Sequence, residues 1–309
     1  MKLAIPDLIS NSYFPALAAA ELGFFAREGI DVSAELIFPV DRAYAALRDG
    51  EVDFVGGAAH GALAAFPSWR GVRLLGALSQ RMYWFLVMRA ELGIARGDLA
   101  ALKGRRIGAA PWVEMGLRRL LVASGLDPGR DRIEIAPVPG ATGSSVNFGL
   151  TAAEALAAGK IDGFWANGMA TELAVTTGVG SIVLDVRRGD GPAGCFDYTM
   201  PVLATTERLI ERSPESAAAA VRALVATQTA LKHDVSRATE VGRKRFPPRE
   251  AELIAGIVRR DLPFYSASIS EASVIAINAF CRDVGVLDGD VSYDRIVALQ
   301  FRQFWCEKG

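Results

Sequence analysis

Short apolar runs alternate with helical patterns through roughly the first 200 residues of the chain. Leu3–Ile5 is predicted to be a buried strand, and Ser12–Arg27 carries apolar residues at helical spacing. Val32–Phe38 is predicted to be the next strand, and Val52–Val55 is a further short strand that Gly56–Gly57 is expected to break. The order strand, helix, strand indicates parallel βαβ units.

A phrase of eight residues occurs twice in the chain. Ala46–Asp53 reads ALRDGEVD, and Ala155–Asp162 reads ALAAGKID, 109 residues later. Each copy ends a helix at a glycine and enters a strand through an acidic residue, and Lys2–Pro6 has a looser counterpart in Arg106–Pro111. Such a phrase can recur by chance, but two similar βα units one domain length apart indicate two lobes of similar fold.

From Thr206 onward the pattern becomes helical throughout, and this segment is expected to pack on the first lobe. The predicted helices are Thr206–Arg212, Pro214–His233, Val235–Phe246, Pro248–Arg260, Ser270–Val284 and Tyr293–Trp305. The sequence therefore predicts an α/β protein in which each lobe has a mostly parallel sheet flanked by helices, followed by a helical C-terminal segment. We expect residues 1–86 and 200–309 to form lobe 1, and residues 87–199 to form lobe 2.

Composition restricts the classes of function. The chain has 309 residues, 51% of them hydrophobic, which is enough for two cores of ordinary size. The net charge is −1 with both signs spread along the chain, so we expect no nucleic-acid partner. Two histidines and three cysteines leave little material for a metal site, and no cofactor is expected. No run of about 18 apolar residues predicts a membrane span.

The cysteines and the N-terminus leave the compartment open. Cys195, Cys281 and Cys306 have no metal-like spacing, and either one Cys281–Cys306 bridge or three free thiols fits an odd count. Met1 leads directly into an apolar strand rather than a cleavable leader. We expect a periplasmic protein if a leader was removed, and a cytoplasmic protein if Met1 is the native start.

Candidate ligand-binding residues follow the predicted strands, because ligands of open parallel sheets lie beyond the carboxyl ends of the strands. Helix amino ends meet there and present free N–H groups with partial positive charge. Capping, surface exposure or core packing is the structural alternative for any one of these residues. In the first lobe the candidates that follow strands are Ser10, Asn11, Ser12, Tyr13, Arg42, Ala59 and His60. Three more candidates, Arg81, Tyr83 and Trp84, precede the apolar strand Phe85–Met88, where the chain is expected to pass between the lobes.

The second lobe offers a parallel set of candidates after its own strands. Those that follow strands are Pro111, Trp112, Glu114, Trp165 and Asn167, and Tyr198 lies near the predicted return crossing between the lobes. Taken with the first lobe, six tryptophans and tyrosines fall at predicted loop ends, although each alone is more often a packing residue. Together they favour a flat or aromatic ligand. We expect Ser10, Asn11, His60 and Asn167 to donate or accept hydrogen bonds, and Trp112 and Trp165 to stack on the ligand.

Three segments carry a resemblance to a known family. Ser12–Val32 contains a helix that ends in G-F-F followed by E-G-I-D-V, Ala45–Phe54 fits A-L-x-x-G-x-[IV]-D, and Leu102–Gly108 reads LKGRRIG. In these segments the chain resembles the NMT1/THI5-like and sulfonate/taurine/nitrate group of periplasmic binding proteins. The opening segment is fairly specific to that group, and the other two are common among two-lobed binding proteins.

The resemblance implies a periplasmic-binding-protein-like fold of type II, with crossing strands between the lobes. It also implies that a small molecule is gripped in the cleft and delivered to an ABC permease. The ligands that the resemblance implies are carboxylates, sulfonates or heteroaromatic compounds. It does not identify the ligand.

Enzymes of the same group supply the alternative. Some members resemble thiamin-pyrimidine synthases, dihydroxyphthalate decarboxylases or a biphenyl sulfinate desulfinase. This chain lacks the cysteine-rich run of the synthases and has no cysteine at Ser10–Pro15, and Cys195 would need His60 beside it to act as a nucleophile. A cofactor-free decarboxylase of a small aromatic acid needs no such motif, so a cytoplasmic enzyme stays the alternative. A sensory or partner-binding module is a third class.

Overall fold

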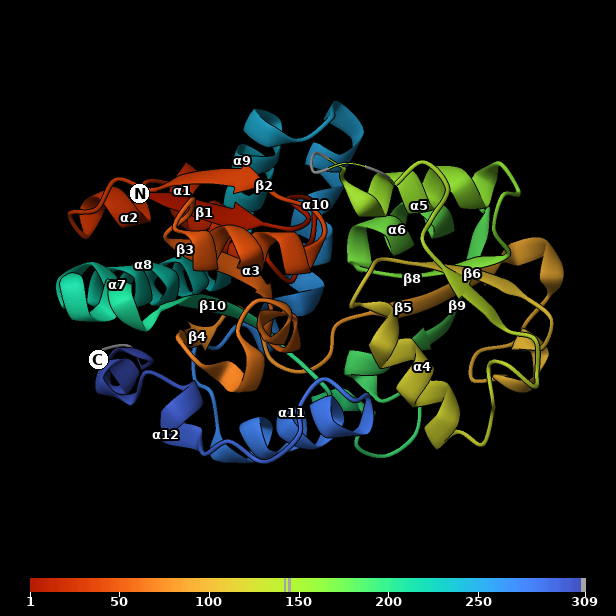
Figure 1. The fold of residues 1–309 in the computed structure, drawn as a ribbon. Helices are drawn as coiled ribbons and strands as arrows, with labels where there is room; N and C mark the ends of the chain where they lie inside the picture. Colours follow the sequence, from red (N-terminus) through yellow and green to blue (C-terminus); the bar gives the residue numbers. More distant parts are fainter. Residues whose placement is uncertain (142, 144–145, 307–309) are drawn as a thin grey trace.

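The computed structural model describes residues 1–141, 143 and 146–306. Within these residues the chain forms two five-stranded sheets, which stand side by side in Figure 1. The first sheet has the order β2-β1-β3-β10-β4 and the second β7-β6-β8-β5-β9. The strands are β1 (Lys2–Ile5), β2 (Ser33–Leu36), β3 (Phe54–Ala58), β4 (Val72–Ala77), β5 (Phe85–Arg89), β6 (Arg106–Ala109), β7 (Glu134–Ala136), β8 (Gly163–Ala166), β9 (Gly180–Asp185) and β10 (Pro201–Thr206).

Helices cover both sheets. The α-helices are α1 (Phe14–Glu21), α2 (Phe24–Arg27), α3 (Val40–Asp49), α4 (Glu114–Ala123), α5 (Phe148–Ala157), α6 (Gly168–Thr176), α7 (Glu207–Arg212), α8 (Pro214–His233), α9 (Arg237–Arg245), α10 (Pro248–Asp261), α11 (Glu271–Asp283) and α12 (Tyr293–Ile296). Short 3₁₀ helices used below are η1 (Ala59–Ala64), η5 (Val186–Arg188) and η8 (Leu299–Phe304). None of the α-helices in the described residues combines the length and the apolar character that a membrane crossing requires.

The two sheets share one topology. In the first, β1 pairs in parallel with β2 and β3, while β10 runs antiparallel between β3 and β4. In the second, β6 pairs in parallel with β7 and β8, while β5 runs antiparallel between β8 and β9. The reversed strand of each sheet comes from a part of the chain that crosses over from the other sheet. The prediction of two similar units joined by crossing strands is confirmed, and each sheet is mixed because of its one reversed strand. The exact lobe limits stay a prediction.

The repeated phrase has the same structural role in both sheets. Asp53 accepts a 2.9 Å hydrogen bond at Oδ2 from the backbone N–H of Lys2, the first residue of β1. Asp162 accepts a 2.9 Å bond at Oδ2 from the N–H of Arg106, the first residue of β6. Each acid therefore ties the strand it precedes to the start of the neighbouring parallel strand, which explains why the phrase recurs at this spacing.

Glycines with positive φ end helices in both halves. Gly50 (φ 79°) ends α3, and Gly159 (φ 66°) lies one residue beyond the C-cap of α5. Gly23 (φ 73°) separates α1 from α2, so the single helix predicted over Ser12–Arg27 is two helices. The left-handed conformation at Gly23 cannot continue an α-helix, and glycine adopts it at little cost.

The predicted break at Gly56–Gly57 is wrong, because both glycines lie inside β3. A Cβ at Gly56 would stand 3.0 Å from the Cβ of Ala16 in α1. A Cβ at Gly57 would stand 3.2 Å from Cγ2 of Val40 in α3. The glycines therefore allow two helices to approach the strand closely rather than ending it.

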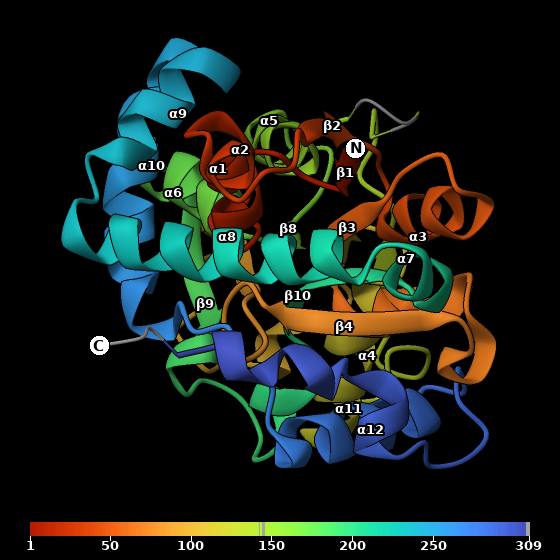
Figure 2. The ribbon, with the colours of Figure 1, turned by 90° about the vertical axis from the view of Figure 1, so that its left-hand side faces the viewer.

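The helical C-terminal segment is largely as predicted. Helix α8 packs on α1 and α2, across the face of the first sheet shown in Figure 2, whereas α10 also contacts α6 of the other half. The helix predicted over Tyr293–Trp305 is interrupted, because Val297 bridges to Leu74 of β4 and the N–H of Ala298 donates to the Leu74 carbonyl at 3.0 Å. This extended pairing separates α12 from η8. All three cysteines are free, so the Cys281–Cys306 bridge is not formed.

Candidate functional site

A small cavity lies where loops from the two sheets meet. Its volume is about 40 Å³. Both halves contribute to its lining. The lining residues before β5 are Pro6, Asp7, Ser10, Tyr13, Phe38, Val40, Tyr83 and Trp84, and those after β6 are Ala110, Val113, Phe148, Trp165, Ala166 and Asn167. Ligand pockets usually measure about 300–1,000 Å³. The two halves are therefore close together, and a ligand of ordinary size requires them to move apart.

The amino ends of five helices converge on this cavity. Tyr13, Val113 and Asn167 are the N-cap residues of α1, α4 and α6. Val40 and Phe148 are the first residues of α3 and α5. Each helix start carries partial positive charge from its N–H groups, so the cavity has the electrostatic character predicted from the strand and helix order.

Asp7 is the acidic residue of the cavity wall, and it bridges the two halves. It follows β1, and its Oδ2 accepts hydrogen bonds from Asn167 Nδ2 at 2.6 Å and from the N–H of Gly149 at 3.3 Å. Its Oδ1 accepts from the N–H of Ile9 at 3.3 Å. Burial raises the pKa of Asp7 to about 7, while these three hydrogen bonds act in the opposite direction. Sequence reasoning missed Asp7, although an acid directly after a buried strand was the available signal.

Two asparagines, one from each half, cap the amino end of α6. Asn167 Oδ1 accepts from the N–H groups of Met169 at 3.0 Å and Ala170 at 3.3 Å. Asn11 Oδ1 accepts from the N–H of Gly168 at 3.1 Å. A Cβ at Gly168 would lie 2.6 Å from Asn11 Oδ1, so this close approach requires glycine. Asn11 therefore acts across the halves, although it does not line the cavity.

Hydroxyl groups of the first half complete the polar part of the wall. The Ser10 side chain is fully buried, and its Oγ has no hydrogen-bond partner among the described residues. The Tyr13 and Tyr83 hydroxyls hydrogen bond to each other. Burial raises the pKa of both tyrosines, so both are neutral at ordinary pH. The Ser10 hydroxyl is therefore a polar group of the wall that makes no hydrogen bond within the described residues.

Aromatic rings form the rest of the wall. The ring centroids of Trp84 and Trp165 lie 5.9 Å apart, and those of Tyr83 and Trp84 lie 4.9 Å apart. Phe38 and Phe148 stack at 5.8 Å across the two halves. This arrangement fits the expectation of a flat or aromatic ligand, which such ring faces would contact.

His60 lies behind the aromatic wall rather than in it. It is fully buried, its Nδ1 lies 2.9 Å from Thr199 Oγ1, and its Nε2 lies 3.0 Å from the carbonyl oxygen of Trp112. Because a carbonyl only accepts, Nε2 carries the proton. Burial lowers the pKa of His60 to about 4, so the ring is neutral near pH 7. Its ring centroid is 6.0 Å from that of Trp84, which connects it to the cavity indirectly.

The other predicted site residues lie outside the cavity lining. Arg42 and Arg81 are exposed, and Pro111 and Trp112 are half-buried. Ala59 is buried and donates its N–H to the Met200 carbonyl. Glu114 lines a separate surface hollow with Arg118 and Arg119, and Tyr198 stacks on Phe280 at 4.8 Å. Residue type and position after a strand located the correct loops but did not determine where each side chain points.

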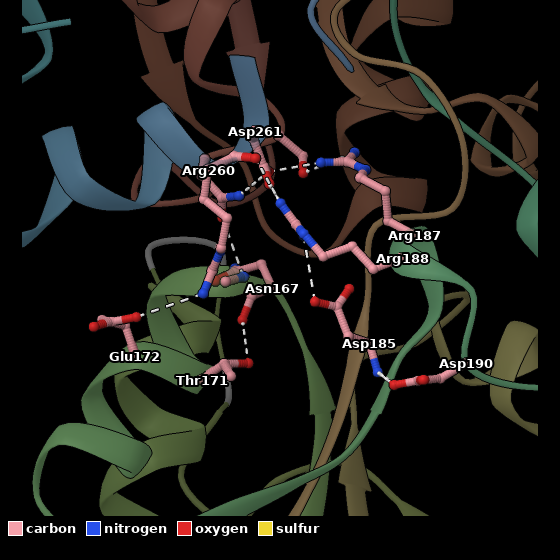
Figure 3. A network of polar contacts seen from close by, with 12 residues as sticks. Asn167, Thr171, Glu172, Asp185, Arg187, Arg188, Asp190, Arg260 and Asp261 are labelled. Atoms are coloured by element: carbon pink, nitrogen blue, oxygen red, sulfur yellow. Dashed lines mark hydrogen bonds and ion pairs between the residues drawn. The ribbon is translucent and has the colours of Figure 1, made fainter. Parts of the chain in front are cut away.

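Figure 3 shows a buried ion pair of Arg187 and Asp261. The Arg187 guanidinium lies 5.7 Å from the ring centroid of Tyr83, which lines the cavity. Arg187 Nη1 of η5 lies 2.6 Å from Asp261 Oδ2 at the end of α10, and each side chain is 2% exposed. Arg187 Nη2 donates to Ser79 Oγ at 2.8 Å and to Ser12 Oγ at 3.3 Å. Ser12 therefore accepts a hydrogen bond from this pair and does not line the cavity. The pair joins η5, which follows the second sheet, to the C-terminal segment.

Charges around this pair extend the link between the halves. Arg188 Nη2 lies 3.3 Å from Asp261 Oδ1, and Asn11 Nδ2 donates to Asp261. Arg260 of α10 pairs with Glu172 of α6 at 3.6 Å (Figure 3). Asn11 thus connects the ion pair to the α6 amino end. Sequence reasoning found Asn11 and Ser12 but none of their charged partners.

Several larger hollows open on the surface, and two of them exceed 500 Å³. One, about 560 Å³, lies along α8 and η8, and all its lining residues come from the C-terminal segment. The other, about 610 Å³, lies between α4 and the end of α11. Neither encloses buried polar groups of both sheets, so we assign the candidate site to the smaller cavity.

Two features bear on chemistry at the site. Among the residues that the structure describes, no cluster of three or more His, Cys, Asp or Glu side chains is arranged to hold a metal ion. Burial raises the pKa of the Cys195 thiol to about 12, which keeps it protonated and weakens it as a nucleophile.

Comparison with known structures shows the same fold. A protein from Bordetella bronchiseptica RB50 aligns with a TM-score of 0.74 at 20% identity, covering 98% of this chain and 95% of that one. The alkanesulfonate-binding protein SsuA from Xanthomonas axonopodis pv. citri, bound to MOPS, aligns with a TM-score of 0.70 at 14% identity, covering 97% and 96%. The desulfurization enzyme DSZB aligns with a TM-score of 0.64 at 18% identity, covering 98% and 97%.

These alignments confirm the predicted fold class, which binding proteins and an enzyme share. A search of curated protein sequences found no match. The NMT1/THI5 like family model matches residues 10–235, which is most of the chain and includes the segments that carried the resemblance. The chain belongs to the NMT1/THI5 like family.

Proposed function

We propose that this protein captures a small molecule in the cavity between its two halves and delivers it to an ABC permease. The observation that carries the proposal is the cavity itself, because both halves supply its wall and five helix amino ends face it. The fold shared with an alkanesulfonate-binding protein supports the same function. A periplasmic location follows from this function and is part of the proposal.

Capture would proceed by closure of the two halves. The hydrogen bonds that bridge the halves, such as Asn167 to Asp7 and the Gly168 N–H to Asn11, form only when the halves are together. Closure removes water from the cavity, which strengthens each polar contact with the ligand. The candidate ligands to be tested are small carboxylates, sulfonates and heteroaromatic compounds, because the wall combines helix amino ends, which favour anions, with aromatic rings.

Thermal melting with a panel of these compounds tests the proposal. A ligand present at about 100 times its Kd stabilises the folded state by about 2.7 kcal/mol, which raises Tm by several degrees. We expect at least one member of the panel to do so. If none shifts Tm at millimolar concentration, the protein does not capture these classes and the proposal fails.

A matched pair of variants places the binding in the cavity. Ser10 and Ser181 both have a buried hydroxyl without a partner among the described residues, but Ser181 lies in β9, outside the cavity. Ser10→Ala is expected to weaken ligand binding about tenfold, since one hydrogen bond is worth about 1 kcal/mol or more. Ser181→Ala is expected to bind like the wild type. Mass spectrometry of the released ligand separates the enzyme alternative, because a receptor returns the compound unchanged.

A further inference from the structure

The cavity wall has an acidic side chain but no basic one among the described residues. Asp7 is its acidic group, and among the described residues that line the cavity none is arginine, lysine or histidine. The nearby guanidinium of Arg187 is engaged by Asp261, Ser12 and Ser79. An anionic ligand entering this cavity would therefore meet a buried carboxyl group without a basic side chain to pair with.

Two of the three helix amino ends that the second half brings to the cavity, those of α5 and α6, are also occupied by the protein's own side chains. The N–H of Gly149, in the first turn of α5, donates to Asp7. The N–H groups of Gly168, Met169 and Ala170, at the start of α6, donate to Asn11 and Asn167. In this closed arrangement Asp7 accepts a hydrogen bond from α5 that would otherwise be available to a ligand anion. The N–H groups at these two helix ends are thus engaged by one resident carboxyl group and two amide oxygens.

Asp7 retains capacity for one more hydrogen bond. A carboxylate has about four acceptor positions, and Asn167, Gly149 and Ile9 use three of them. The remaining position can accept only from a donor. The neighbouring rings of Tyr83, Trp84 and Trp165 provide flat apolar surface for the body of the ligand.

We propose that Asp7 determines specificity, selecting a flat ligand whose N–H group donates a hydrogen bond to it and discriminating against a free anion. This inference rests on the proposed function and names the ligand class of the same site. A donor from the ligand satisfies the fourth acceptor position of the carboxylate. A free anion instead faces a like charge in a low-dielectric cavity, and it binds only when Asp7 takes up one proton.

Isosteric pairs of probes test this directly. Benzamide and benzenesulfonamide donate N–H groups and are neutral at pH 8, whereas benzoate and benzenesulfonate have the same shapes and carry a negative charge. Titration calorimetry at pH 8 is expected to show that each amide binds the wild type at least about tenfold more tightly than its anion. Asp7→Asn is expected to weaken amide binding and to abolish or reverse this preference.

Two further measurements keep the result interpretable. Asp41→Asn removes a charge from the first turn of α3 without changing the cavity lining, so it should keep the wild-type preference. In the wild type, benzoate affinity should fall about tenfold for each pH unit above pH 7, the value to which burial raises the pKa of Asp7, and this test needs no variant.

The outcomes separate the two proposals. Tighter binding of the anions than of the amides at pH 8, unchanged in Asp7→Asn, overturns the role of Asp7 and leaves the capture function intact. Benzoate affinity that does not change between pH 6 and pH 9 also overturns it. If neither these four probes nor the wider panel shifts Tm, the capture function itself fails, and this inference fails with it.

Discussion

Asn167 holds Asp7 across the boundary between the two sheets, with 2.6 Å between Asn167 Nδ2 and Asp7 Oδ2. The same side chain caps α6 through its Oδ1, which accepts from Met169 and Ala170. One amide therefore fixes the start of a helix in the second half and orients an acid of the first half. This double role makes Asn167 a test of how strongly the halves are coupled.

Asn167→Ala is expected to lower the free energy of unfolding by about 2–3 kcal/mol. Loss of a helix N-cap costs about 1 kcal/mol, and a buried acceptor left with fewer partners adds about 1–2 kcal/mol. Urea denaturation of the variant and the wild type measures the change. Asn147→Ala is the control, because Asn147 is the N-cap residue of α5 but makes no side-chain capping bond. Its cost should stay below about 0.5 kcal/mol. Equal losses in the two variants would contradict the role assigned to Asn167.

The ion pair of Arg187 and Asp261 gives a second prediction. Asp261→Asn leaves the Arg187 guanidinium buried without its counter-charge, and such losses cost about 3–5 kcal/mol. Glu252→Gln is the comparison, since Glu252 pairs with Arg243 at 3.0 Å but the two side chains are 62% and 68% exposed. Exposed pairs are worth about 0–1 kcal/mol.

Chemical denaturation of the two variants and the wild type measures both changes. If Asp261→Asn costs no more than Glu252→Gln, the buried pair does not hold η5 to α10. A larger loss for Asp261→Asn should also come with weaker coupling between the halves, seen as faster proteolysis between β9 and β10.

Local patterns predicted much of this fold, because they depend on neighbours in the chain. The phrase around Gly50 and Asp53 fixes a helix end and a strand start within a few residues, so its copy at Gly159 and Asp162 revealed the second unit. The break between α12 and η8 was missed because it depends on pairing with Leu74, which is distant in sequence.

The site was predicted less completely for the same reason. Trp165 was found from its place after a strand, and Tyr83 and Trp84 from their place where the chain was expected to cross between the lobes. All three line the cavity. The partners of Asp7 and Arg187 lie 160 and 74 residues away, so no local pattern brings them together. Only the crossing of the chain between the sheets does so.

Asp7 and His60 give a prediction about pH, because their pKa values are shifted in opposite senses. Burial raises the pKa of Asp7 from 3.8 to about 7, so between these values the folded state holds a proton that the unfolded state has lost. Stability from Asp7 is therefore full at low pH and is lost as pH rises towards 7. Burial lowers the pKa of His60 from 6.5 to about 4, so the unfolded state holds the extra proton and stability is lost as pH falls from 6.5 to 4.

The two effects oppose each other between about pH 4 and pH 6.5, so they should largely cancel in the unfolding free energy of the wild type. Variants that remove one group should show the effect of the other. Relative to the wild type, the unfolding free energy of Asp7→Asn should rise with pH by about 1 kcal/mol per unit, and that of His60→Gln should fall by about as much. Urea denaturation at pH 4.5, 5.5 and 6.5 measures the slopes, and the double variant should return close to the wild-type slope. Since each shift arises from burial rather than from a shared partner, the two slopes should add. If the unfolding free energy changes with pH in the same way in all four proteins, neither Asp7 nor His60 is desolvated as its buried position requires.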